Sequence, residues 1–244
     1  MRWIINTEKA MEKHVKEVMK LKKYASFDEV SQYIRPYLVE GDVYEKTFDE
    51  LYNEWIDVME PDECLEFCKE TQPELPTNVW MDLTMVYILD WGEEYWSIDS
   101  WDYVTKEMME RWRLRMPLLQ KTAMENLEKG KNIIYRRLGY DEIEIDTPVY
   151  LLQYKTHLMP SYGASAVLSG KARKALLKLM KEPYYILLFD RRAVFMVPVS
   201  AVDRKEDIRK VKDSVMKSRL YSGDFLTDRV FKYDGERLME IVIN

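Results

Sequence analysis

The sequence predicts an α+β fold in which a helical N-terminal segment is joined to a mixed or antiparallel sheet packed with helices. Up to about residue 75, apolar residues recur at helical spacing behind helix-start signals. From residue 79 onward, several segments instead alternate apolar and polar residues or form short apolar runs, which is typical of strands. At 244 residues with 47% hydrophobic and 33% charged residues, the chain has a globular composition and can bury a sizeable core.

Helices are predicted over residues 7–23, 26–41 and 47–58, followed by a short helix beginning near Pro61. Ser26 and Glu29 form a capping box for the second of these helices, whose inward positions are Val30, Ile34 and Leu38. Residues 72–76 contain two prolines and are not helical. The chain is therefore divided into an acidic helical segment, residues 1–75, and an α+β domain, residues 76–244.

In the second part, the apolar residues at odd positions over 79–89 predict one strand, which turns at residues 90–93 and returns over 95–98. Further strands are expected at 149–154, 162–168, 184–189, 193–197 and on both sides of Asp234-Gly235, a pair typical of hairpins. Helices are expected at 100–112, 117–129, 171–181 and 203–217. The runs 184–189 and 193–197 are apolar on both faces, which predicts two central strands.

Several short segments between residues 79 and 240 also follow the order and spacing of a bacterial family. They are Asp82–Tyr87, Leu118–Asn126, Gly163–Ser165, Tyr185–Leu188, Val194–Pro198 and Leu226–Asp234. The chain thereby resembles an uncharacterised domain-of-unknown-function family frequent in gut Firmicutes, with a layout similar to the YtpQ-like proteins. The resemblance implies an α+β fold and no particular activity. A Pro-Ser-Ser step of that family is replaced here by Phe189–Arg192, and its N-terminal part is not visible in residues 1–75.

Charge is distributed unevenly along the chain, and this asymmetry suggests a protein partner. Residues 1–100 hold 10 Lys and Arg against 23 Asp and Glu, whereas the remainder holds 27 against 20. Much of the acidic excess lies between Glu40 and Glu74. Such a run can steer a basic partner, although ordinary solvated helix faces explain the same pattern.

The sequence contains no recognisable catalytic, metal or cofactor motif. Cys64 and Cys68 share one predicted helix face, but neither His14 nor His157 has metal-ligand spacing to them. The chain lacks the G-x-S-x-G elbow and the glycine-rich phosphate loop. We therefore predict no metal, no cofactor and no catalytic residue.

Carboxylates near two predicted turns give an alternative reading as a hydrolase. Asp82, Asp90, Glu93 and Glu94 cluster around the first predicted hairpin, while Asp190 lies beside Arg191 and Arg192 in the link between the two apolar runs. If these ends met, Asp82, Asp90 and Asp190 would form an acid–base site supported by the two arginines. Turns are also naturally rich in Asp, so this arrangement has an ordinary structural explanation.

The sequence thus favours a non-catalytic intracellular binding protein, acting through its acidic N-terminal helices or an exposed aromatic hairpin. The candidate binding residues are Trp91, Glu93, Glu94, Asp190, Arg191 and Arg192. Nucleic acid is an unlikely partner because the basic helix at 171–181 carries aliphatic rather than aromatic residues. No apolar stretch is long enough for a membrane helix and none reads as a signal peptide, which predicts a cytoplasmic protein.

Overall fold

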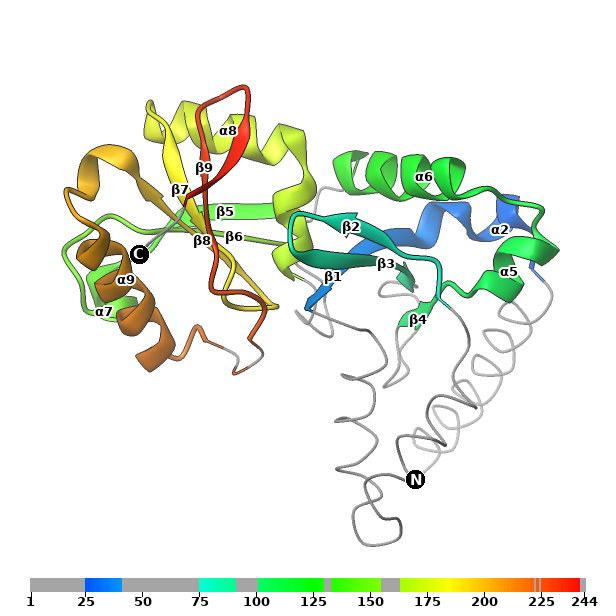
Figure 1. The fold of residues 1–244 in the computed structure, drawn as a ribbon, viewed down its shortest axis with the longest axis horizontal. Coiled ribbons are helices and arrows are strands. Elements are labelled where there is room, and N and C mark those ends of the chain that lie inside the picture. The colour runs from blue at the N-terminus through cyan, green and yellow to red at the C-terminus, as the bar shows by residue number, and fades with distance from the viewer. Residues whose placement is uncertain are drawn as a thin grey trace, which may run out of the picture.

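The computed structural model describes residues 25–40, 75–90, 101–129, 133–154, 163–221, 223 and 225–241. Within them, helices pack against two sheets whose strand pairs are all antiparallel, which confirms the α+β class (Figure 1). Four strands form one sheet, which we call sheet A, and six form sheet B. The predicted elements at 7–23, 47–58, from Pro61 and at 95–98 lie outside the described residues.

Sheet A is built on the long strand β3 (Leu83–Asp90), which pairs along its length with β1 (Ile34–Glu40). The short strands β2 (Asn78–Trp80) and β4 (Trp101–Tyr103) pair with the two ends of the other edge of β3. The single strand predicted over 79–89 is interrupted at Met81, whose φ of 58° places it in the turn between β2 and β3.

The helix predicted over residues 26–41 is wrong beyond Tyr33. The capping box exists, since Glu29 Oε2 accepts from the Ser26 N–H at 2.7 Å, but α2 (Phe27–Val30) and the 3₁₀ turn η1 (Ser31–Tyr33) end at β1. β1 is an edge strand within which Pro36 is tolerated, because one of its edges needs no ladder hydrogen bond. On that outer edge, the Leu38 N–H donates instead to Ser165 Oγ at 3.2 Å.

Two helices follow β4. α5 (Lys106–Arg111) begins after Thr105, whose hydroxyl accepts from the Met108 N–H at 3.1 Å, so the helix predicted from residue 100 starts six residues later and is preceded by a strand. α6 (Met116–Lys129) agrees with the prediction for 117–129, and its buried residues are Leu119, Ala123 and Leu127. Repeated at every fourth position, these residues form one apolar stripe in the core.

Sheet B has the strand order β10-β9-β7-β8-β6-β5. In chain order the strands are β5 (Ile133–Arg137), β6 (Tyr150–Tyr154), β7 (Tyr184–Leu187), β8 (Val194–Pro198), β9 (Val230–Tyr233) and β10 (Leu238–Ile241). The two runs that are apolar on both faces are indeed the central strands β7 and β8, and Asp234-Gly235 forms the β9–β10 turn.

Helices lie on both faces of sheet B. α8 (Gly170–Met180) covers one face, while α7 (Tyr140–Ile143) and α9 (Lys205–Lys217) lie on the opposite one (Figure 1). Two hydrophobic clusters lie on the two faces of sheet B, because successive side chains of a strand point to opposite faces. On β7, Tyr184 and Ile186 belong to the cluster that contains α8, and Leu187 belongs to the cluster that contains α9. Residues 163–168 form the 3₁₀ segment η2, so the strand predicted at 162–168 is wrong.

The hydrophobic cluster that contains α8 extends through both sheets. Trp80 of β2 packs against Phe231 of β9, with ring centroids 6.1 Å apart, and Arg35 Nε of β1 donates to the Tyr154 hydroxyl of β6 at 3.3 Å. The boundary predicted between residues 75 and 76 therefore falls between β1 and β2, two strands of the same sheet, and β1 also contacts sheet B.

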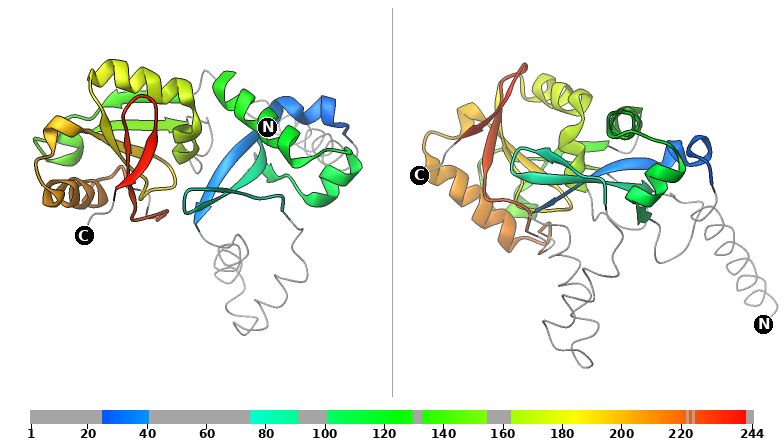
Figure 2. Two further views of the ribbon diagram at one scale, coloured as in Figure 1. Left: turned by 45° about the horizontal axis from the view of Figure 1, so that its top comes forward. Right: turned by 45° about the vertical axis from the view of Figure 1, so that its right-hand side comes forward.

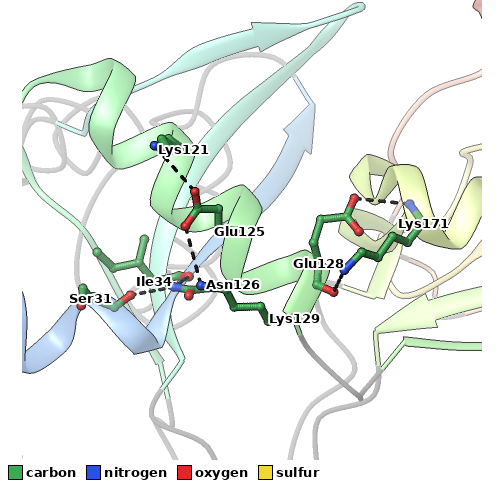
Figure 3. A network of polar contacts seen from close by, with 8 residues as sticks. All are labelled: Ser31, Ile34, Lys121, Glu125, Asn126, Glu128, Lys129 and Lys171. Carbon is green, nitrogen blue, oxygen red and sulfur yellow. Dashed lines mark hydrogen bonds and ion pairs between the residues drawn. The ribbon is translucent and has the colours of Figure 1, made fainter.

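A polar contact ties α6 to the start of α8 (Figure 3). Glu128 accepts from the Gly170 N–H at 2.6 Å and from the Ser169 hydroxyl at 3.1 Å. Lys171 Nζ donates to the Glu128 carbonyl oxygen, as Figure 3 shows. A carboxylate here satisfies N–H groups left free by the first turn of α8 and interacts favourably with the helix dipole. The same helix α6 is tied to η1 through Asn126, which donates to the carbonyl oxygens of Ser31 and Ile34.

Candidate functional site

Asp82, the first carboxylate singled out from the sequence, joins the two sheets. Its Oδ2 accepts a hydrogen bond from the Thr227 hydroxyl at 2.6 Å and lies 3.1 Å from Arg229 Nε. Asp82 lies in the turn between β2 and β3. This end of the hairpin lies beside the segment that leads into β9 (Figure 2). The side chain is only 17% exposed, so these contacts hold the carboxylate largely out of water.

Asp90 lies far from Asp82. The two residues lie at opposite ends of β3, and a rise of about 3.3 Å per residue separates them by roughly 25 Å. Asp90 itself pairs with Trp101 of β4 in the ladder. The hydrolase alternative requires Asp82, Asp90 and Asp190 to converge, and the extended strand β3 keeps the first two of them apart.

Asp190 shapes the link between β7 and β8. It is fully buried, and its Oδ1 accepts from the Arg192 N–H at 2.6 Å, which closes a tight turn. The Arg191 carbonyl oxygen accepts from the Ala164 N–H of η2 at 3.0 Å. The close approach requires glycine at position 163, because a Cβ there would lie 1.7 Å from the Arg192 carbonyl oxygen. The Asp190 side chain and the backbone groups of Arg191 and Arg192 thus have a structural role in this link, and their choice as binding residues stays a prediction.

The remaining predicted site residues cannot be placed. Trp91, Glu93 and Glu94 lie outside the described residues. Of the described Asp and Glu side chains, no three lie close enough together to hold a metal ion. None of the helices in the described part of the chain has the length and apolar character needed to span a membrane.

A pocket of about 520 Å³ lies next to the contact made by Asp82. One wall is α9, and the opposite wall is formed by the ends of β7 and β9 and by residues 227–229. Its apolar lining consists of Leu187, Phe189, Ile208, Met216 and Val230; its charged lining consists of Arg209, Lys212, Asp213, Asp228 and Arg229. The pocket therefore combines an apolar wall with an excess of one positive charge.

Lys212 places a partly buried positive charge in the pocket. It is 27% exposed and pairs with the carboxylate of Asp228. Its Nζ lies 6.0 Å from the ring centroid of Phe189 and 5.5 Å from that of Phe225, within the range of cation–π attraction. Burial lowers the pKa of Lys212 below its ordinary value, and the nearby charge of Asp213 opposes this shift.

Asp82, which lies in the turn between two strands of sheet A, holds two residues that line this pocket. Thr227 and Arg229, both held by Asp82, line the pocket and flank Asp228. The rim is held further by the Thr227 N–H, which donates to the Leu188 carbonyl oxygen at 3.2 Å, and by Arg229 Nη1, which lies 2.9 Å from Glu240 Oε2. Asp82 is therefore a positioning residue for one wall of the pocket.

Sequence reasoning missed this pocket, although it located α9. α9 begins at Lys205, two residues after the start of the helix predicted over 203–217, and the Arg204 N–H donates to Asp207 Oδ2 at 3.1 Å. Only the packing of residues 225–229 against the helix makes Lys212 part of a pocket.

A second groove, of about 750 Å³, lies between α7 and the end of α9. Its lining is mostly polar and includes Glu142, whose carboxylate accepts two hydrogen bonds from Arg136, at 2.6 and 2.7 Å. These hydrogen bonds and one from the Gly139 N–H lower the pKa of Glu142 to about 2. This groove lacks the apolar wall of the pocket beside α9.

Comparison with known proteins adds no function to this geometry: no family model, no curated protein and no solved structure matches the chain.

Proposed function

We propose that this protein is a non-catalytic binding protein that takes up its ligand or partner in the pocket beside α9. One observation carries the proposal: buried apolar side chains and the partly buried cation of Lys212 face the same space of about 520 Å³. Sites for organic ligands typically combine this volume, an apolar lining and a few placed polar groups.

The positions of the three carboxylates also favour a binding function over hydrolysis. Asp82 is held by Thr227 and Arg229, and Asp190 holds the β7–β8 link from a fully buried position. A general acid or base must reach a substrate proton to within hydrogen-bond distance. A fully buried Asp190 and an Asp90 remote from Asp82 do not offer that geometry, so we prefer binding to the hydrolase reading.

The acidic run between Glu40 and Glu74 remains a second element of the proposal. Most of it lies outside the described residues, so its role rests on charge alone. A basic protein partner attracted by this run would be released as salt screens the interaction. This dependence separates it from contacts in the pocket, where apolar burial contributes and screening is weaker.

The test is purification of the tagged protein from its native host, with native mass spectrometry of the molecules that remain bound. Met216, which lines the pocket and is exposed, is replaced in Met216→Glu; Leu179→Glu on the exposed surface of α8 is the matched control. We expect the wild type and Leu179→Glu to retain a stoichiometric ligand or partner that Met216→Glu loses.

Two outcomes would contradict the proposal. Retention by Met216→Glu at wild-type level would show that the pocket is not the binding site. Purification of all three proteins without any bound molecule, at low and at moderate salt, would argue against a stable binding function. Loss of a partner only when salt is raised would instead support the acidic run as the contact surface.

A further inference from the structure

We propose that the pocket beside α9 binds a small organic monoanion, with a carboxylate or similar group joined to an apolar body, and that this group replaces the carboxylate of Asp228 on Lys212. The inference rests on the proposed binding function and names the chemical class of its ligand.

The apolar wall requires an apolar body. Leu187, Phe189, Ile208 and Val230 are all buried against the α9 side of sheet B, and the exposed Met216 lies at the same pocket. Phe189 is rigidly placed, because its ring stacks on Phe195 with centroids 5.2 Å apart and planes 7° from parallel. The buried side chains form an apolar floor, and an apolar group lying on it would cover the exposed surface of Met216, which favours binding.

The position of Lys212 requires an anionic group. Its ammonium group lies beside two aromatic rings and is partly withdrawn from water. An ammonium group in such surroundings needs a counter-charge, since burial of an unpaired cation is unfavourable. A ligand carboxylate inside the pocket would provide that counter-charge, away from most of the solvent that weakens an exposed ion pair.

Asp228 is suited to be displaced. Its side chain is 73% exposed, whereas that of its partner Lys212 is 27% exposed, so the pair joins a sheltered cation to an anion that stays in water. An ion pair whose carboxylate stays in water contributes little to stability, because water screens the charge. The Asp228 carboxylate can therefore return to water at small cost when another anion binds Lys212.

Charge balance indicates a monoanion. Arg229 is already paired with Asp82 and Glu240, which leaves Lys212 and Arg209 against the carboxylates of Asp213 and Asp228. Exchange of one carboxylate, that of Asp228, for the single charge of a ligand leaves the balance inside the pocket unchanged. A dianion such as inorganic phosphate would add a negative charge next to Asp213, which is unfavourable.

The test uses 8-anilinonaphthalene-1-sulfonate, an aromatic monoanion whose fluorescence rises on binding in an apolar site, with competition by octanoate. We expect octanoate to displace the dye. Acetate has the charge without the apolar body and 1-octanol has the body without the charge, so neither should compete at the same concentration. Displacement by 1-octanol as effective as that by octanoate would overturn the requirement for an anion.

Variants locate the site. Lys212→Met keeps the apolar stem and should weaken dye and octanoate binding on the order of tenfold, the equivalent of one charge-assisted hydrogen bond. Asp228→Asn removes the internal competitor and should strengthen binding about threefold or more. Lys210→Met is the matched control, because Lys210 also lies on α9 but pairs with Asp207 outside the pocket, and its affinity should be unchanged.

Opposite effects of Lys212→Met and Asp228→Asn cannot arise from general loss of structure, and the exposed Asp228→Asn carries the test even if Lys212→Met folds poorly. Equal affinity of wild type, Lys212→Met and Asp228→Asn would overturn the inference. If octanoate fails to bind while Met216→Glu still loses a host ligand, the ligand class is wrong but the binding function stands.

Discussion

Replacing Asp82 with Ala is expected to lower the free energy of unfolding by about 2–3 kcal/mol, because a hydrogen bond involving a charged group contributes about 1.5–3 kcal/mol. Asp82 makes two such contacts, with the Thr227 hydroxyl at 2.6 Å and with Arg229 Nε at 3.1 Å, and is 17% exposed. Both contacts join the two sheets. The expected loss is smaller than the sum of the two contributions, because Arg229 keeps its second partner, Glu240, in the variant.

Glu240 provides an internal comparison. It pairs with the same Arg229 at 2.9 Å, a shorter distance than that from Arg229 to Asp82, but its side chain is 40% exposed. Solvent screening limits such pairs to about 0–1 kcal/mol. If burial rather than distance decides the contribution, Glu240→Ala should cost about 0.5 kcal/mol, several times less than Asp82→Ala.

The assay is equilibrium unfolding in urea, followed by circular dichroism, for wild type, Asp82→Ala, Glu240→Ala, Thr227→Val and the double variant Asp82→Ala/Thr227→Val. The double-mutant cycle isolates the hydrogen bond between Asp82 and Thr227, and we expect a coupling of about 1 kcal/mol or more. Equal costs for Asp82→Ala and Glu240→Ala, or a coupling near zero, would refute the reasoning that this buried contact fastens the two sheets.

Two further predictions concern other parts of sheet B. The pKa of Glu142 is lowered to about 2 by its contacts with Arg136, so its contribution to stability is complete above its ordinary pKa of 4.5 and is lost as pH falls toward 2. Arg136→Met should cost about 0.5–1 kcal/mol at pH 7, because both side chains are partly exposed, and less at pH 2.5; urea unfolding at both pH values measures this, and a pH-independent cost would contradict it. Gly163→Ala should destabilise by about 2 kcal/mol or more, because its Cβ would overlap the Arg192 carbonyl oxygen, while Gly170→Ala, whose Cβ meets no atom closer than 3.6 Å, should be neutral or stabilising. Thermal unfolding compares the two alanine variants, and equal melting temperatures would contradict the close approach.

Local patterns succeeded wherever one element buries a regular face. The 3.6-residue spacing located α6, α8 and α9, and apolar runs located β7 and β8, because these segments meet the core with the period of their own backbone. The resemblance to the uncharacterised bacterial family stays a prediction.

The helix prediction failed where tertiary pairing determined the local structure. Residues 34–40 place apolar side chains at Ile34 and Leu38, which fits a helix, yet they form β1 against the whole length of β3. Pro36 was the contrary signal, because proline is poorly tolerated inside a helix but fits an edge strand. β1 lies at the edge of sheet A, beside β3, and on its outer side the Leu38 N–H donates to Ser165 Oγ of η2, a contact between distant parts of the chain.

The sequence by itself determined the α+β class and most helices and strands of residues 116–241, since periodicity is a property of neighbouring residues. Tertiary structure alone decided which groups each carboxylate contacts. A strand of fixed rise holds Asp82 and Asp90 apart, while folding brings Asp82 to Thr227 across 145 positions of the chain. The pocket around Lys212 has the same origin, because its two walls come from segments whose contact no local pattern specifies.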